Sequence, residues 1–197
     1  MSQENLRSLP IFTTSDASKL GVSRMTLSRL VDSGQLEKIQ RGLYGWIDRP
    51  ESELCSFAEV SARVDGVISL LSALRYYNIT TQEPFEVWLQ IESRKRVPKM
   101  EHLNLRVFKV GKSQLSLGVV EVVIDGVRAK VTNVERTVVD CFKFRNKVGL
   151  DVAIEVLIEA QRANLINADK LWLYAKELRM ANVMMPYLEM AGKLGDL

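Results

Sequence analysis

The sequence predicts an α+β protein: an N-terminal winged helix-turn-helix, then a mixed α/β domain with a small, mainly antiparallel sheet and a C-terminal helical region. Two short helix patterns joined by a glycine turn open the chain, and an alternating run follows them. Farther along, alternating apolar residues predict strands, and apolar spacings of three and four predict helices. We therefore expect one domain over 1–48 and a second over 52–197, with Arg49-Pro50-Glu51 as the linker.

The composition is that of a folded chain. Of the 197 residues, 47% are hydrophobic and 26% are charged, which excludes a disordered or low-complexity protein. No apolar run approaches the roughly 18 residues of a membrane span, and the first ten residues lack the apolar core of a signal peptide. The two cysteines, Cys55 and Cys141, are too far apart to suggest a disulfide framework, which favours a cytoplasmic location.

The first fifty residues have the pattern of a helix-turn-helix. Thr14 or Ser15 can cap a short first helix, and Gly21 suits the left-handed position that ends it. Ser23 can cap a second helix over 24–33. Two short helices joined by a turn that begins with glycine are typical of this motif.

The second helix has one apolar and one cationic side. At about 100° per residue, Leu27, Leu30 and Val31 face inward. The opposite side is polar and basic, as a recognition helix in the DNA major groove requires. The residues that we assign to DNA from this helix and its cap are Ser23, Arg24, Met25, Thr26, Ser28 and Arg29.

The period then changes to two, which predicts a β-hairpin. Runs over 36–39 and 43–47 flank Arg41-Gly42, and a tight turn needs such a glycine. This hairpin would form a wing whose cations lie against DNA phosphates. The wing residues assigned to DNA are Lys38, Gln40, Arg41 and Tyr44. A structural or protein-binding role for the whole motif is the alternative.

The second domain shows a helix, strand, helix order. The sequence predicts helices over 52–64 and 68–77, with Asn78 as the stop of the second, and then about four strands. Asp125-Gly126 is a strong hairpin signal. Thr132 to Glu135 has the spacing of a capping box that opens the next helix. The strands are expected near 85–91, 103–108, 119–124 and 127–131, and the later helices near 152–163, 168–179 and 184–193.

Two regions carry a resemblance to a known family. The runs Phe12-Thr-Thr-Ser-Asp-Ala, Leu20-Gly-Val-Ser-Arg-Met-Thr-Leu-Ser-Arg-Leu-Val and Gly34-Gln-Leu-Glu-Lys-Ile-Gln-Arg-Gly-Leu-Tyr resemble the winged helix of AbiEi-type antitoxins. Glu135-Arg-Thr-Val-Val-Asp-Cys-Phe resembles the C-terminal domain of the same family. The resemblance implies an antitoxin of an abortive-infection system that represses its own operon. Its C-terminal domain would neutralise a nucleotidyltransferase-like toxin, with or without direct contact.

The resemblance also implies how the protein meets its partners. The operator would be an inverted repeat of double-stranded DNA, which takes two copies even if the free protein is a monomer. A stand-alone regulator whose C-terminal domain senses a ligand or a protein partner is the alternative function.

The sequence offers no enzymatic constellation. His102 is the only histidine, and no CxxC or Cys–His spacing predicts a zinc site. A nucleotidyltransferase needs a Gly-Ser pair followed by paired carboxylates, and both are missing. Arg136 and Asp140 lie four residues apart and can pair on one helix face. We therefore expect no enzyme activity, no metal and no cofactor; an enzyme targeted by the winged helix is the least favoured hypothesis.

Charge is unevenly distributed in the second domain. Residues 94–134 hold nine basic and three acidic residues. The basic block could be a face for an acidic partner, an additional phosphate contact or a solvated surface. The resemblance favours a role in neutralisation. The residues of this predicted antitoxin or partner face are Arg94, Lys95, Arg96, Lys99, Arg106, Lys109, Lys112, Arg128 and Lys130.

Overall fold

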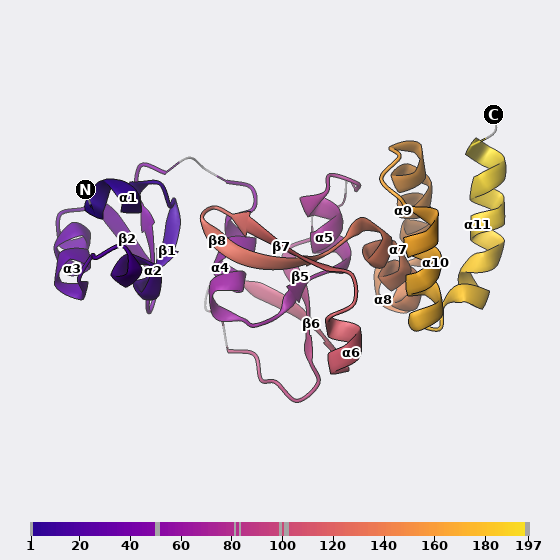
Figure 1. Ribbon diagram of the computed structural model, residues 1–197, viewed down its shortest axis with the longest axis horizontal. Helices are drawn as coiled ribbons and strands as arrows, with labels where there is room; N and C mark the ends of the chain where they lie inside the picture. Colours follow the sequence, from indigo (N-terminus) through magenta and orange to yellow (C-terminus); the bar gives the residue numbers. More distant parts are fainter. Residues whose placement is uncertain are drawn as a thin grey trace. The chain divides into compact units, whose positions relative to one another are not determined.

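The computed structural model describes residues 2–49, 52–80, 82, 84–98, 100 and 103–195. Helices and strands both contribute to the fold, which confirms the mixed α+β class (Figure 1). The chain separates into two compact units, Met1–Asp65 with Glu121–Ala129, and Gly66–Val120 with Lys130–Leu197. The domain boundary expected near residue 50 stays a prediction, and Pro50 and Glu51 lie outside the described residues.

The first unit contains a three-stranded antiparallel sheet in the order β1-β3-β2. Two helices, a turn and a hairpin follow one another, which is the element order expected for a winged helix. The sequence pattern missed the first strand, since three residues are too short to show a period. The elements are α1 (Ser2–Arg7), β1 (Ile11–Thr13), α2 (Thr14–Lys19), α3 (Arg24–Asp32), β2 (Leu36–Gln40), β3 (Leu43–Trp46) and α4 (Cys55–Arg63).

A small apolar core holds these elements together. Phe12, Ala17, Leu27 and Trp46 are buried in it, so one residue from each of β1, α2, α3 and β3 meets the others. The Trp46 indole N–H donates a hydrogen bond to a backbone carbonyl of α1 at 3.3 Å. Burial of these side chains is the main force that fixes α3 on the sheet.

The cap of α2 differs from the prediction by one residue. Thr13, and neither Thr14 nor Ser15, is the N-cap. Its hydroxyl accepts a hydrogen bond from the Asp16 backbone N–H at 3.2 Å, and the Asp16 carboxylate accepts one from the Thr13 N–H at 3.1 Å. This reciprocal capping box satisfies two backbone donors at the start of the helix.

The second sheet has five strands in the order β6-β5-β4-β8-β7, and its residues 121–129 belong to the first unit. The expectation of a mainly antiparallel sheet was wrong, because β4 pairs with β8 and β5 pairs with β6 in parallel. Pairing of β4 with β5 is antiparallel. The elements up to the last strand are β4 (Val67–Ile68), α5 (Leu70–Tyr76), β5 (Glu86–Glu92), β6 (Asn104–Val110), α6 (Lys112–Leu115), β7 (Val119–Ile124) and β8 (Val127–Thr132).

Strand β5 is covered on both faces. Trp88 and Gln90 are 4% and 1% exposed, although they alternate with the apolar residues of the strand. The backbone N–H of Trp88 donates a hydrogen bond to the Ser72 hydroxyl of α5 at 2.9 Å. The Gln90 side chain donates a hydrogen bond to the buried carboxylate of Asp140 at 2.7 Å, so it faces protein and not solvent.

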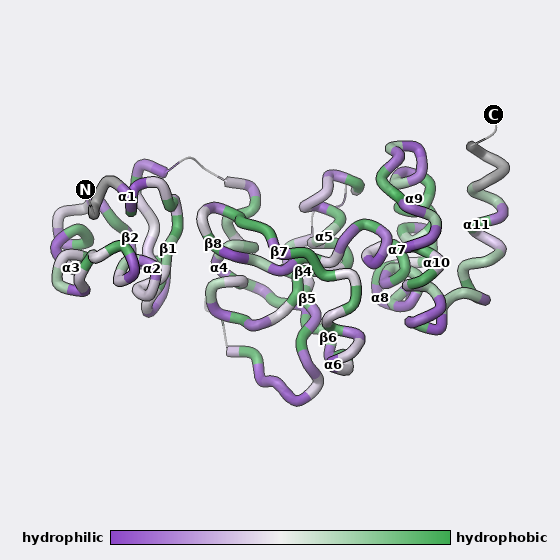
Figure 2. The backbone as a smooth tube through the Cα atoms, in the orientation of Figure 1, coloured by the Kyte–Doolittle hydropathy of each residue, from purple (hydrophilic) through white to green (hydrophobic). Residues whose placement is uncertain are grey.

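The helices after the sheet form one apolar core with α5 and β5. The N-cap of helix α7 is Asn133, whose side chain accepts a hydrogen bond from the Arg136 backbone N–H. The capping box predicted to begin at Thr132 is therefore one residue too early. Figure 2 shows hydrophobic and hydrophilic residues alternating along these helices, as amphipathic packing requires. They are α7 (Val134–Lys143), α8 (Arg145–Val148), α9 (Leu150–Arg162), α10 (Ala168–Glu177) and α11 (Ala181–Gly195).

Candidate nucleic-acid interface

Helix α3 is capped at its start and anchored along one side. The Ser23 hydroxyl accepts a hydrogen bond from the Thr26 backbone N–H at 3.1 Å. This bond satisfies one of the backbone N–H groups of the first turn, which have no partner within the helix. Leu27 and Leu30 are 0% and 7% exposed. The anchored side fixes which residues the helix presents to solvent.

The outward side of α3 is cationic and accessible. Arg24, Met25, Ser28 and Arg29 are all exposed, and Met25 is 67% exposed. The Arg29 guanidinium lies 3.8 Å from the Met25 sulfur, so these two long side chains run together along the surface. The first turn of the helix holds no acidic residue. Polyanions are therefore attracted to this face, and its short and forked donors suit base edges.

The β2–β3 hairpin places a second group of polar side chains in the same unit. Lys38 and Arg41 are exposed, and Gln40 is half-buried. Gly42 has a φ of 79°, which favours glycine at the turn. Its carbonyl accepts hydrogen bonds from the Thr14 N–H and hydroxyl, at 2.9 and 3.2 Å. These bonds tie the hairpin turn to the first turn of α2.

Three carboxylates of this unit, those of Asp16, Glu37 and Asp48, are already paired with basic side chains. Asp48 binds Arg7 at 2.7 Å, and the hydrogen bond from Arg7 lowers the pKa of Asp48. Glu37 binds Arg49. Arg24, Arg29, Lys38 and Arg41 have no carboxylate partner within the described part of the chain. The positive charge of α3 and the hairpin is thus not neutralised by these three acids.

The pairing of Asp16 also lowers its pKa. Burial acts in the opposite direction, but the hydrogen bonds from Thr13 and the charge of Lys19, 3.5 Å away, prevail. The carboxylate that closes the capping box is therefore ionised at neutral pH.

Three of the predicted contact residues are partly committed to the fold. The hydroxyls of Ser23 and Thr26 lie 3.0 Å apart and hydrogen-bond to each other. Tyr44 is half-buried, and its ring stacks on Phe12 with centroids 6.1 Å apart. The roles of these three residues in DNA binding stay predictions, and only their hydroxyl groups would contact DNA.

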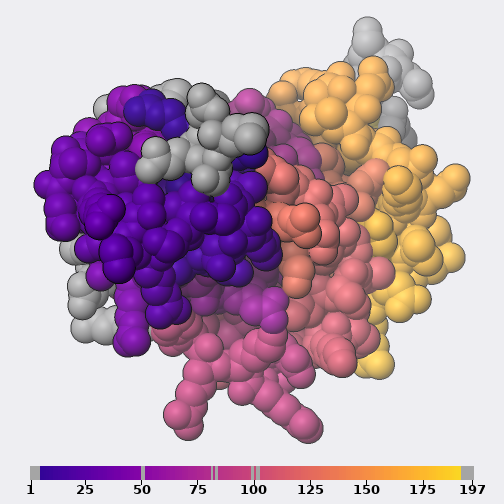
Figure 3. Space-filling view, turned by 60° about the vertical axis from the view of Figure 1, so that its left-hand side comes forward, coloured from indigo at the N-terminus to yellow at the C-terminus, as the bar shows by residue number. Residues whose placement is uncertain are grey.

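The basic block of the second unit begins in the connection between β5 and β6. Arg94 and Arg96 are exposed, whereas Lys95 is half-buried. In Figure 3, pink side chains from this part of the chain project from the surface. Lys99 lies outside the described residues, as does the lone histidine, His102.

The remaining basic residues differ in their surroundings. Arg106 lies 4.6 Å above the Trp88 ring and 3.5 Å from a carboxylate oxygen of Glu86, so its charge is partly compensated. Lys109 and Lys112 are exposed. Arg128 and Lys130 are exposed at alternate positions of β8, but they belong to different units. One continuous cationic face therefore stays a prediction.

Sequence reasoning found one charged pair but missed its environment. Arg136 and Asp140 do pair, at 2.9 Å, with side chains 1% and 0% exposed. Arg136 also donates to the Gln90 amide oxygen at 3.2 Å and to the backbone carbonyls of Gln114 and Leu117 at 2.8 and 3.0 Å. Burial raises the pKa of Asp140 against the opposing charge of Arg136. The spacing of four signals the pair, and nothing local signals its burial.

Within the described ranges, no helix is both long and apolar enough to cross a bilayer. The same ranges contain no group of three or more His, Cys, Asp or Glu side chains that could hold a metal ion.

Comparison with known families bears on the first unit. Residues 1–49 match the family model described as a transcriptional regulator, AbiEi antitoxin. Over these residues the chain is similar to the AbiEi antitoxins. Both α3 and the β2–β3 hairpin lie inside the matched residues, and the basic block and the Arg136 network lie outside them.

A solved structure shares the fold beyond the AbiEi region. The RV2827C protein from Mycobacterium tuberculosis superposes with a TM-score of 0.50 at 13% sequence identity. The likeness covers 84% of this chain and 66% of the mycobacterial chain, and it concerns the fold alone. No curated protein sequence matches the chain.

Proposed function

We propose that this protein is an antitoxin and a transcriptional autorepressor. Its winged helix binds inverted-repeat operator DNA upstream of its own operon, and its second unit neutralises a cognate nucleotidyltransferase-like toxin. Two copies bind one operator, one at each half-site. The reaction chemistry belongs to the toxin, and the antitoxin itself makes and breaks no bond.

The observation that carries the proposal is the exposed cationic face of α3 beside a basic hairpin. Arg24 and Arg29 extend from the outward side, and no acid occupies the first turn. Guanidinium groups bind guanine edges in the major groove with two hydrogen bonds, and short hydroxyls such as that of Ser28 reach any base. Lys38 and Arg41 then hold the phosphate backbone and set the register of the helix.

Neutralisation is assigned to the second unit because it has a core of its own. That core includes α7, whose Glu135-Arg-Thr run resembles the family's C-terminal domain. A unit with an independent core can keep its shape when the DNA-binding face of the other unit is altered. The two activities are therefore separable by substitution.

The separation can be tested with the double variant Arg29→Ala, Arg41→Ala. We expect gel shifts to show loss of operator binding, whereas co-expression with the toxin still rescues growth. Lys147→Ala, Lys170→Ala is the matched control, because both lysines are exposed in the second unit. Melting curves must show that both variants fold. Operator binding that survives the loss of both arginines contradicts the proposed interface.

A second function is favoured by one further feature. The C-terminal helices surround a groove with polar groups at one end, described next, which suits a stand-alone regulator that senses a ligand. Co-expression with the neighbouring toxin separates the two proposals, since only an antitoxin restores growth.

A further inference from the structure

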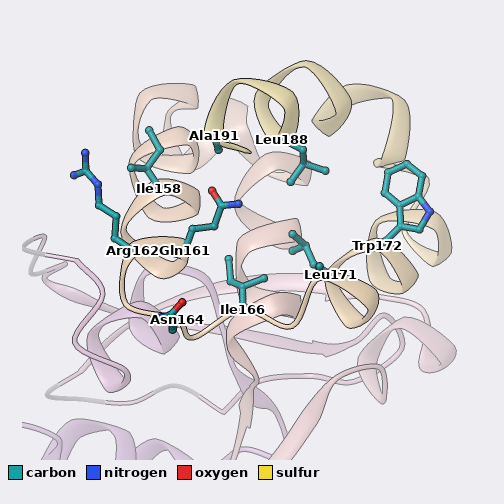
Figure 4. Close-up of a pocket in the computed structure, with 10 residues that line it drawn as sticks. Ile158, Gln161, Arg162, Asn164, Ile166, Leu171, Trp172, Leu188 and Ala191 are labelled. Carbon is teal, nitrogen blue, oxygen red and sulfur yellow. The ribbon is translucent and has the colours of Figure 1, made fainter. Parts of the chain in front are cut away.

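Helices α9, α10 and α11 enclose a groove of about 790 Å³ in the second unit (Figure 4). Pockets that bind small organic molecules usually measure about 300–1,000 Å³ and combine an apolar lining with a few polar groups. The lining residues are Ile158, Gln161, Arg162, Asn164, Ile166, Ala168, Leu171, Trp172, Leu188 and Ala191.

The walls of the groove are the side chains of three helices at helical spacing. Ile158 and Arg162 come from α9, Ala168 and Leu171 from α10, and Leu188 from α11. Residues three or four apart share one face of a helix, so each helix presents one stripe to the same space. Asn164 and Ile166 come from the short connection between α9 and α10, so the groove is lined by three helices and one connection.

The groove has a polar end and an apolar end. Gln161, Arg162 and Asn164 lie together on one side in Figure 4, and Trp172 lies on the opposite side. Ile166, Leu171 and Leu188 occupy the space between them. A ligand that fills this space must have an apolar body and one polar head.

The polar end offers hydrogen-bond donors. The side-chain amides of Gln161 and Asn164 have no hydrogen-bond partner within the described part of the chain. Arg162 uses one N–H on Glu159, at 3.0 Å, and this pair is largely exposed to solvent. A guanidinium has five N–H donors, so the remaining ones can meet a carboxylate. Charge-assisted hydrogen bonds of this kind are about twice as strong as neutral ones.

We propose that this groove binds a small amphipathic carboxylate, with its carboxylate at Gln161, Arg162 and Asn164 and its apolar body between Leu171 and Leu188. The site lies entirely in the second unit and uses none of the residues assigned to DNA. The inference therefore stands or falls separately from operator binding and toxin neutralisation.

Decanoate is the probe, and decyltrimethylammonium, with the same chain length and opposite charge, is its control. We expect isothermal titration of the full chain to show saturable one-to-one binding of decanoate. Binding of the cation should be at least tenfold weaker, since one charge-assisted hydrogen bond is worth about that factor.

Two variants locate the bound molecule. Arg162→Gln should remove the preference for the anion, and the control Lys170→Gln should keep it, because Lys170 is exposed on α10 and does not line the groove. Ala168→Phe should fill the groove and abolish binding of both probes, and Leu173→Phe, at a residue 52% exposed and outside the groove, should not.

Melting curves and gel shifts on the same variants show whether they fold and still bind DNA. If Ala168→Phe does not fold, Gln161→Leu is the second variant, because it removes a polar group from the proposed carboxylate site and keeps the apolar walls. The proposal is overturned if decanoate binding does not saturate, if the two probes bind equally well, or if Ala168→Phe leaves binding intact. A groove that binds neither probe but is covered by a helix of a co-purified protein overturns it as well.

Discussion

The number of DNA phosphates that the wing contacts can be measured from the salt dependence of operator affinity. We define the wing as the β2–β3 hairpin, residues 36–46. Lys38 and Arg41 are its exposed cations without a carboxylate partner in the described residues. The perturbation is Lys38→Gln together with Arg41→Gln. Neither residue belongs to the buried core, so the fold should keep its stability to within about 0.5 kcal/mol.

The expected magnitude follows from counterion release. Each phosphate that a protein cation neutralises adds about −0.9 to the slope of log affinity against log salt concentration. Two wing cations in each of two bound copies make about four contacts. The double variant should therefore reduce the steepness of the slope by about 3.6.

Fluorescence anisotropy with a labelled operator is the assay. Between about 50 and 200 mM salt, the native protein should lose roughly a hundredfold more affinity than the variant. Lys147→Gln, Lys170→Gln removes two exposed cations of the second unit and is the matched control. A slope that is the same in the native protein and the wing variant would refute phosphate contact by the wing.

Three further predictions concern the rest of the molecule. Asp140→Leu should lower the free energy of unfolding by about 3–5 kcal/mol, because Arg136 is left as an unpaired buried charge, and adding Arg136→Met should restore part of it; urea unfolding measures both. Reversal of charge at Arg94, Lys95 and Arg96 should impair growth rescue more than gel shifts, and unchanged rescue would leave this segment as a solvated surface. Because the pKa of Asp16 is lowered by folding, its ionised carboxylate stabilises the fold at pH values above the ordinary pKa of 3.8, and this contribution is lost as the pH falls through the lowered pKa. Asp16→Asn should remove this part of the pH dependence from an acid unfolding curve measured by circular dichroism.

Local signals in the sequence predicted the turns and the faces of short helices well. Gly42, Asp125 and Gly126 have φ values of 79°, 48° and 84°, as the predicted hairpin turns require. Asn78, expected to stop a helix, has a φ of 54° just after α5. Such turns are set by a few adjacent residues, and for this reason sequence spacing is enough to find them.

Strand pairing was predicted poorly because it depends on residues far apart in the chain. β4 consists of Val67 and Ile68, and the sequence suggested that Ile68 begins a helix. Two residues carry no period, but Ile68 pairs with Val131, 63 positions away, and places β4 at the centre of the sheet. This central strand turns an apparent run of hairpins into a mixed sheet.

The candidate sites differ in the same way. The outward side of α3 follows from its own periodicity, because Leu27 and Leu30 fix which residues point away from them. A charged pair such as Arg136 and Asp140 reads the same in sequence whether it lies in water or in a core.

Other parts of the chain permit the burial of that pair. The Gln90 amide oxygen of β5 and two backbone carbonyls at the end of α6 accept hydrogen bonds from the Arg136 N–H groups that Asp140 does not bind. Those acceptors come from 19 to 46 residues away along the chain. The groove of α9, α10 and α11 has the same origin, because each helix contributes only an ordinary amphipathic stripe. Features made by one element can thus be read from its pattern, whereas features made where several elements meet require their arrangement in space.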